Sequence, residues 1–230
     1  MRDLRALLSS KTRTVRKFRH RHGVLSTSVL IVLKPLWDLG IFRAGHILCV
    51  RPEWVNAALQ DSDGSVEHRF LTESEIGALR DPSKSEFPQY VSDLGIARGD
   101  PCFGSFSSGE LASVTWVAET PFVQWGSLLL FPENYAFIHS RFTLHRFRGR
   151  RLQPTSIVKL TQALGERGLR GLLSTVDVTN PASVKGARRA GFKKVGTVIQ
   201  LGSKRRVYTV LSPGARRFGF SLGRNPGEDE

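Results

Sequence analysis

The segment from Phe142 to Phe192 constrains the fold of this chain more than any other stretch. An extended, aromatic-rich run enters a tight basic turn around Gly149, and an amphipathic helix leaves that turn. A second apolar strand follows and ends at Asn180, before a short helix that Gly191 closes. The segment therefore predicts a strand–turn–helix–strand–helix unit, which is typical of a layered α/β domain.

The turn between the first strand and the helix has the chemistry of a phosphate site. A turn that opens a helix presents free backbone N–H groups at the positive end of the helix dipole. Arg148, Arg150 and Arg151 add guanidinium groups at the same place, and guanidinium geometry suits phosphate oxygens. We expect this turn to bind a phosphate or a pyrophosphate.

Two sequence elements of this segment resemble the GNAT superfamily of acyl-CoA-dependent N-acyltransferases. That family carries a V-x-P-x-(Y/F)-R-G-R-G-x-G/A turn and, after a helix and a strand, an N-x-x-(A/S)-x(7)-G-F element. The corresponding turn positions are occupied here by Thr143, His145, Phe147 and Arg148, and the second element is matched by Asn180, Ser183, Gly191 and Phe192. The resemblance extends from about His68 to Val210 and implies the fold of that superfamily.

Three positions depart from the family pattern. Arg151 stands where the family has its central glycine and Gln153 where it has glycine or alanine, although small residues there let the backbone approach the pyrophosphate. Ala187 stands where the family often has a tyrosine that acts as general acid. Two outcomes are open for Arg151: its side chain crowds the turn, or it points outward and binds a phosphate.

The resemblance implies a site for acetyl-CoA, or another acyl-CoA, as co-substrate. Its pantetheine arm is expected along the backbone of Arg141, Phe142 and Thr143. Its pyrophosphate is expected at the motif arginine and at the N–H groups that follow, at Arg148, Gly149, Arg150, Arg151, Leu152 and Gln153. Asn180 is expected to contact the pantetheine arm and Ser183 to lie near the CoA, while an ordinary helix N-cap is an alternative role for Asn180.

Direct transfer of an acyl group from a thioester to an amine requires a group that takes a proton from the amine. His139 lies four residues before Thr143 on the same predicted strand, and Glu119 lies at the end of a predicted hairpin strand. We consider both as candidate catalytic bases, each against the alternative of an ordinary structural or surface residue. The sequence has no cluster with metal-ligand spacing, so we expect no metal.

Patterns along the rest of the chain complete the predicted fold. Thr72 and Glu75 form a capping-box pattern that opens a helix, and Ser107, Ser108 and Gly109 supply a hairpin turn within 102–119. Further strands are expected at 46–52, 127–131, 135–145, 172–178, 195–201 and 205–211, and further helices at 85–97, 152–167 and 181–190. We expect an α/β layered fold with a mixed, mostly antiparallel sheet flanked by helices.

We divide the chain into a basic and apolar N-terminal extension (1–45), a GNAT-like acyltransferase domain (46–222) and a polar tail (223–230). The apolar run 24–42 is interrupted by Lys34, Pro35, Asp38 and Gly40, which argues against a membrane span. Two interpretations of the extension stay open: an amphipathic segment packed on the domain, or peripheral contact with anionic membrane. The two cysteines indicate a reducing compartment, so we expect a cytoplasmic protein, with any peripheral contact at the inner face of the membrane.

The net charge of +14, from 34 basic and 20 acidic side chains, indicates an anionic partner. We favour an N-acyltransferase that moves an acyl group, expected to be acetyl, from acyl-CoA to a primary amine of a small molecule or amino sugar. One alternative is a non-catalytic protein of the same fold that binds CoA or an anionic partner. Another is a transferase of the same fold that uses aminoacyl-tRNA, but neither interleaved aromatic residues nor an RNA-binding module supports nucleic acid as the partner.

Overall fold

The structure is a computed structural model that describes residues 41–59, 66–124, 126–203 and 206–223, together with Leu36 and Leu39. Most of the predicted N-terminal extension and residues 224–230 of the predicted tail lie outside the described residues. Within the described ranges, no helix combines the length and the apolar character that crossing a membrane requires.

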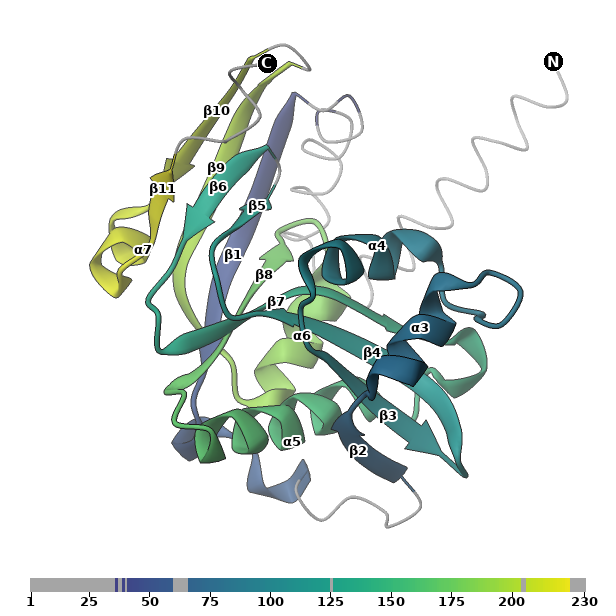
Figure 1. Ribbon diagram of the computed structural model, residues 1–230. Coiled ribbons are helices and arrows are strands. Elements are labelled where there is room, and N and C mark those ends of the chain that lie inside the picture. The colour runs from purple at the N-terminus through teal and green to yellow at the C-terminus, as the bar shows by residue number, and fades with distance from the viewer. Residues whose placement is uncertain are drawn as a thin grey trace, which may run out of the picture.

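The central element is a mixed sheet with eight strands in the described part of the chain (Figure 1). From one edge to the other, the strands are β10 (Arg206–Leu211), β9 (Lys193–Ser203), β1 (Phe42–Val50), β8 (Gly171–Asp177), β7 (Tyr135–Thr143), β4 (Glu110–Ala118), β3 (Cys102–Ser107) and β2 (Val66–Phe70). All neighbouring pairs are antiparallel except β7 and β8, which are parallel. The predicted mixed, mostly antiparallel sheet is therefore confirmed.

Strand β1 lies in the middle of this sheet although it comes first among the described strands. It pairs with β8 on one side, from Gly45↔Asp177 to Val50↔Leu172, and with β9 on the other. Its residues from Ile47 to Val50 are buried, as expected for a central strand that is covered on both faces. The strand begins at Phe42, so the sheet includes the last residues of the stretch that we assigned to the extension.

Two helices cover one face of the sheet, α5 (Leu152–Glu166) and α6 (Pro181–Ala190) (Figure 1). The apolar stripe of α5, formed by Ile157, Leu160 and Leu164, packs in one core with Val117 of β4 and Ile138 of β7. This spacing places the three side chains on one side of a helix, which is the side that the sheet buries. The packing fixes the N-terminal end of α5 beside the end of β7.

The opposite face is covered in two parts. Helices α3 (Glu73–Arg80) and α4 (Gln89–Arg98) form a core with β3 and β4 around the fully buried Trp116. The second part is a small sheet of β11 (Ser221–Gly223), β6 (Ser127–Leu130) and β5 (Phe122–Gln124), with helix α7 (Pro213–Phe218). Only β6 of this second part was predicted, because strands of three residues and a six-residue helix carry too little periodicity.

Local sequence signals set several boundaries as predicted. Thr72 and Glu75 form a complete capping box at the start of α3. The β3–β4 hairpin turns at Ser108 and Gly109, which both have positive φ, as a type I′ turn requires. Gly191 ends α6 with a φ of 101°, a conformation that glycine adopts without steric conflict.

Candidate functional site

Strands β7 and β8 lie side by side for four residues and then separate. Their parallel pairing runs from Tyr135↔Gly171 to Ile138↔Ser174. Beyond it, β7 continues to Thr143 and pairs with β4 only. In the described part of the chain, the edge of β7 that faces β8 therefore has no strand partner from residue 139 to 143, and backbone groups on this edge are available to a ligand.

A β-bulge marks the point where the strands separate. Trp116 pairs with Ser140 and the next residue of β4, Val117, pairs with Ile138, so His139 is an extra residue in β7. A bulge bends its strand and changes which face the following side chains take. Beyond this bulge, Arg141 and Thr143 lie on the side of the sheet that α5 and α6 cover.

The predicted phosphate turn follows β7. The chain passes through the short 3₁₀ helix η3 (His145–Phe147), and Gly149 and Arg151 then have positive φ values of 85° and 59°. Helix α5 begins directly after Arg151, with no acidic residue in its first turn. The backbone N–H groups of residues 149–153 donate to no acceptor within the described ranges. These groups are the donors that an anion at a helix N-terminus uses.

The start of α6 faces the same space. Asn180 is the N-cap of this helix, and its side-chain oxygen accepts a hydrogen bond from the backbone N–H of Ser183 at 3.1 Å. The N-cap role that we considered for Asn180 is thus present, and its side-chain NH₂ keeps two donors for a ligand. Ala187, at the position of the family's tyrosine, is buried on the same helix and brings no hydroxyl group.

A cavity of about 520 Å³ lies between the separated strands, α5 and α6. A smaller cavity of about 250 Å³ adjoins it at the turn, and Thr143, Arg148 and Gln153 line both. Seven of the predicted cofactor-binding residues line the larger cavity: Arg141, Phe142, Thr143, Arg148, Gln153, Asn180 and Ser183. Three more line the smaller one: Gly149, Arg151 and Leu152. The two cavities form one groove, of the size that small-molecule ligands occupy.

The groove is basic. Its described lining has no acidic side chain and contains four arginines, Arg141, Arg148, Arg151 and Arg189. Arg150 lines neither cavity, because its guanidinium lies over the ring of Phe147, 5.4 Å from the ring centroid. The side chain of Arg150 therefore lies outside the groove, whereas Arg148 and Arg151 line it.

The two departures at the turn have structural explanations. Arg151 keeps the left-handed conformation that the family's glycine favours, with φ 59° and ψ 17°, and its side chain is exposed. Its side chain thus points outward and leaves the turn open. Gln153 connects the start of α5 to β7 through a hydrogen bond, in which its side-chain nitrogen donates to Oγ1 of Thr143 at 3.0 Å. The Gln153 oxygen Oε1 is buried and has no hydrogen-bond partner among the described residues.

Arg141 differs from the other arginines of the groove. It lies on β7 beyond the bulge and lines the larger cavity. Burial lowers the pKa of its guanidinium from the usual value. An arginine nevertheless stays protonated at neutral pH, so the cavity holds a half-buried positive charge.

His139, the first candidate base, points to the other face of the sheet. Its Nε2 lies 3.1 Å from Oδ2 of Asp100, and the same carboxylate pairs with Arg98 at 2.8 Å. Burial raises the pKa of Asp100, but the contacts with His139 and Arg98 outweigh this effect and the pKa is lowered overall. The His139 side chain is 1% exposed and lies beside the ring of Phe122. His139 is therefore at the bulge, but its ring is buried.

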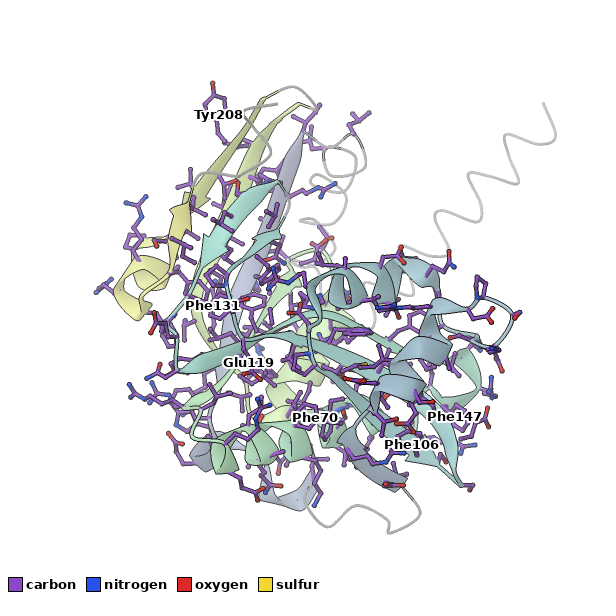
Figure 2. All side chains as sticks on the ribbon, viewed as in Figure 1. Phe70, Phe106, Glu119, Phe131, Phe147 and Tyr208 are labelled. Atoms are coloured by element: carbon purple, nitrogen blue, oxygen red, sulfur yellow. The ribbon has the colours of Figure 1, made fainter. Side chains whose placement is uncertain are left out.

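Glu119, the second candidate base, directly follows β4 and pairs with Arg167 at 2.8 Å, just beyond the end of α5. Figure 2 shows it in the body of the molecule, whereas Tyr208 projects into solvent at the far end of the β9–β10 hairpin. Neither Glu119 nor His139 lines the groove. The structure thus brings together ten of the eleven residues predicted for the cofactor, all except Arg150, and it places the two candidate bases elsewhere.

Sequence reasoning missed three residues near this site. Gly186 and Arg189 of α6 line the groove, and helical spacing from Ser183 could have indicated Gly186. Asp100 had no local signal, since its contact with His139 joins positions 39 residues apart. Among the described residues, no group of three or more His, Cys, Asp or Glu side chains could hold a metal ion, and both cysteines are free and buried.

No family model matches the sequence, and no curated protein is similar to it. Solved structures with a similar arrangement include acetyltransferases of the GNAT family, the superfamily that the motifs resemble. An acetyltransferase of this family from Colwellia psychrerythraea aligns with 71% of this chain and 57% of its own, at 17% identity and a TM-score of 0.49. A GCN5-related N-acetyltransferase from Sphaerobacter thermophilus aligns with 78% of this chain and 55% of its own, at 14% identity and a TM-score of 0.47.

A third structure is AAC(6')-Iy in complex with the bisubstrate analog CoA-S-monomethyl-acetylneamine. It aligns with 56% of this chain and 91% of its own, at 19% identity and a TM-score of 0.43. The present chain spans less than two thirds of the length of the first two structures. Likeness at these identities concerns the fold and identifies neither the substrate nor the activity.

Proposed function

We propose that this chain is an acyl-CoA-dependent N-acyltransferase that moves an acyl group to a primary amine. The observation that carries the proposal is the basic groove at the separation of β7 and β8. One end of the groove has consecutive free N–H groups at residues 149–153, and the other has the open backbone edge of β7. A ligand with phosphates at one end and an extended neutral arm with amide groups complements both parts, and acyl-CoA is such a ligand.

In this proposal, the chain contributes binding and orientation to the reaction. The amine nitrogen forms a bond to the thioester carbonyl carbon, the carbon–sulfur bond breaks, the nitrogen loses a proton and the departing thiolate takes one. Holding the arm along β7 fixes the thioester near the bulge at His139, which converts the encounter with the amine into an oriented one. Backbone N–H groups at the open edge of β7 are suited to stabilise the negative charge that develops on the carbonyl oxygen.

Proton transfer is the less developed part of the proposal. Of the two candidate bases we now prefer His139, because it lies at the bulge and its Nε2 lies 3.1 Å from a carboxylate oxygen of Asp100. Since the ring is buried, the proton reaches it through a bridging water or after a movement of the ring. Glu119 is engaged by Arg167 and is the weaker candidate. With Ala187 in place of tyrosine, we propose that the thiolate takes its proton from solvent.

A second candidate function is a non-catalytic protein of the same fold that binds CoA. Ala187 and the burial of His139 favour it, because they leave the groove without an acid or an accessible base. The two functions share the CoA site and differ only in turnover. The acceptor that we propose for the catalytic case is a small amine or an amino sugar.

Calorimetric titration of the protein with acetyl-CoA and with free CoA, at two salt concentrations, tests the site that both functions need. We expect micromolar binding that survives moderate salt. Arg148→Ala should weaken binding about tenfold or more, since charge-assisted hydrogen bonds contribute about 1.5–3 kcal/mol. Arg150→Ala is the matched control and should change affinity little, because Arg150 lies over Phe147 and outside the groove.

The absence of binding to either ligand would overturn the acyltransferase proposal. If CoA binds, the release of free thiol from acetyl-CoA in the presence of a panel of primary amines separates the two functions. Amine-dependent release establishes the enzyme. Binding without release by any amine supports the non-catalytic protein.

A further inference from the structure

Arg141 holds a positive charge for which the described part of the protein supplies no counter-charge. The residue is half-buried and lines the larger cavity, and its side chain forms no hydrogen bond or ion pair within the described ranges. A charge that is partly removed from water is normally paired, because its lost hydration is otherwise uncompensated. The unpaired state of Arg141 in a cavity therefore indicates that a ligand brings the missing negative charge.

Three other arginines of this protein have partners of the usual kind. Arg98 pairs with Asp100 at 2.8 Å, and Arg69 pairs with Glu75 at 2.7 Å. Arg148, at the turn, donates to the backbone oxygen of Thr143 at 3.2 Å and lies over the ring of Phe142. Arg141 combines a half-buried cavity position with the absence of such contacts among the described residues.

The phosphates of a bound CoA already have donors elsewhere in the groove. The free N–H groups of residues 149–153 and the side chains of Arg148 and Arg151 lie at the turn. Arg141 lies before the turn on β7, beside the open strand edge along which we place the pantetheine arm. That arm has no charge, so the anion that would pair with Arg141 belongs to the part of the ligand beyond the arm.

We propose that Arg141 selects an acyl group that ends in a carboxylate, so that the preferred donor is the CoA thioester of a dicarboxylic acid rather than acetyl-CoA. This inference rests on the proposed function. A guanidinium binds a carboxylate through two parallel N–H···O hydrogen bonds, and burial strengthens that contact. The described lining of the cavity contains no acidic side chain that would repel the carboxylate. In the transfer reaction this carboxylate is a recognition group and takes no part in bond making.

The test compares succinyl-CoA with butyryl-CoA, which has the same number of acyl carbons and a methyl group in place of the carboxylate. Both are titrated calorimetrically into the full chain at equal ionic strength, with free CoA as reference. We expect succinyl-CoA to bind at least tenfold more tightly than butyryl-CoA. Arg141→Met should reduce this ratio to below about twofold, and Arg141→Lys should restore part of the preference.

Arg150→Met is the matched control, because it removes a positive charge of the same segment outside the groove. It should keep the preference, which separates the effect of Arg141 from that of the net charge. Equal affinities of the wild-type chain for the two thioesters would overturn the inference, even if Arg141→Met does not fold. So would a preference that persists in Arg141→Met, or a loss in this variant that affects both thioesters and free CoA alike.

These outcomes also separate the inference from the function on which it rests. Binding of free CoA with no preference between the thioesters overturns only the role of Arg141. Failure of CoA and of both thioesters to bind overturns the proposed function and this inference with it.

Discussion

Replacement of Arg151 by glycine should stabilise this protein, although it removes a charged side chain from the candidate site. Arg151 has φ 59° and ψ 17° and has no side-chain capping hydrogen bond. A left-handed backbone costs a residue with a Cβ about 1–2 kcal/mol, whereas glycine adopts it freely. Glycine in turn loses more conformational entropy on folding, about 0.4–1 kcal/mol. The difference predicts a net gain of about 0.5–1 kcal/mol.

The measurement is thermal and urea unfolding of the wild type, Arg151→Gly and Arg151→Ala. For a domain of this size, about 1 kcal/mol shifts Tm by roughly 2–4 °C, so we expect Arg151→Gly to raise Tm by about 1–4 °C. Arg151→Ala loses the same guanidinium but keeps the Cβ, and therefore keeps the strain. An Arg151→Gly variant no more stable than Arg151→Ala would refute the argument from backbone conformation.

The same two variants separate the roles of the side chain and the backbone in CoA binding. If the Arg151 guanidinium binds a phosphate, both variants should lose affinity equally, by about tenfold. If close approach of the backbone to the pyrophosphate matters more, Arg151→Gly should bind CoA more tightly than Arg151→Ala. Because the side chain is exposed at the edge of the smaller cavity, we expect the first result. A higher affinity of the glycine variant than of the wild type would contradict it.

Three further predictions concern the core, the pH dependence and α6. Gly95→Ala should destabilise the fold by about 1–3 kcal/mol in urea unfolding, because the new Cβ would collide with the ring of the buried Trp116. A Gly95→Ala variant as stable as the wild type would show that α4 can shift. Burial lowers the pKa of His68 from 6.5 to about 4, so the unfolded chain binds the His68 proton more tightly than the folded chain does. The free energy of unfolding should therefore rise between about pH 4 and 6.5 and then level off. His68→Gln should flatten that rise, and an unchanged profile would rule out His68 as its cause. Asn180→Ala should lower the free energy of unfolding by about 1 kcal/mol through loss of the N-cap, whereas Asn180→Ser should keep the cap. An equal loss of stability in both variants would contradict the capping role. A fall of CoA affinity in both variants would show that the Asn180 NH₂ group contacts the ligand.

Much of the candidate groove could be predicted because its parts are local in sequence. The turn, the start of α5 and the N-cap of α6 each depend on a few consecutive residues, and their N–H groups, charges and caps follow from residue type. The motif spacing then related the turn to Asn180 across one helix and one strand. Hydrogen bonds and φ angles of this kind are decided within one or two turns of chain, so a pattern in the sequence is enough to indicate them.

Other features depend on contacts between residues far apart in the chain, and the sequence gives no local sign of them. The position of β1 between β8 and β9 joins residues 42–50 to residues 171–177 and 193–203, and hydrophobic patterns do not specify which strands pair.

The burial of His139 against Asp100 and the pairing of Glu119 with Arg167 are also tertiary, and they changed the interpretation of both candidate bases. The sequence by itself was enough to predict the basic turn, the helix that begins there and the N-cap of the second helix that faces the same groove. Only the tertiary structure decided that Arg141 lines the cavity half-buried and has no charged partner within the described part of the chain, because burial is set by what packs around a side chain and not by its neighbours in sequence.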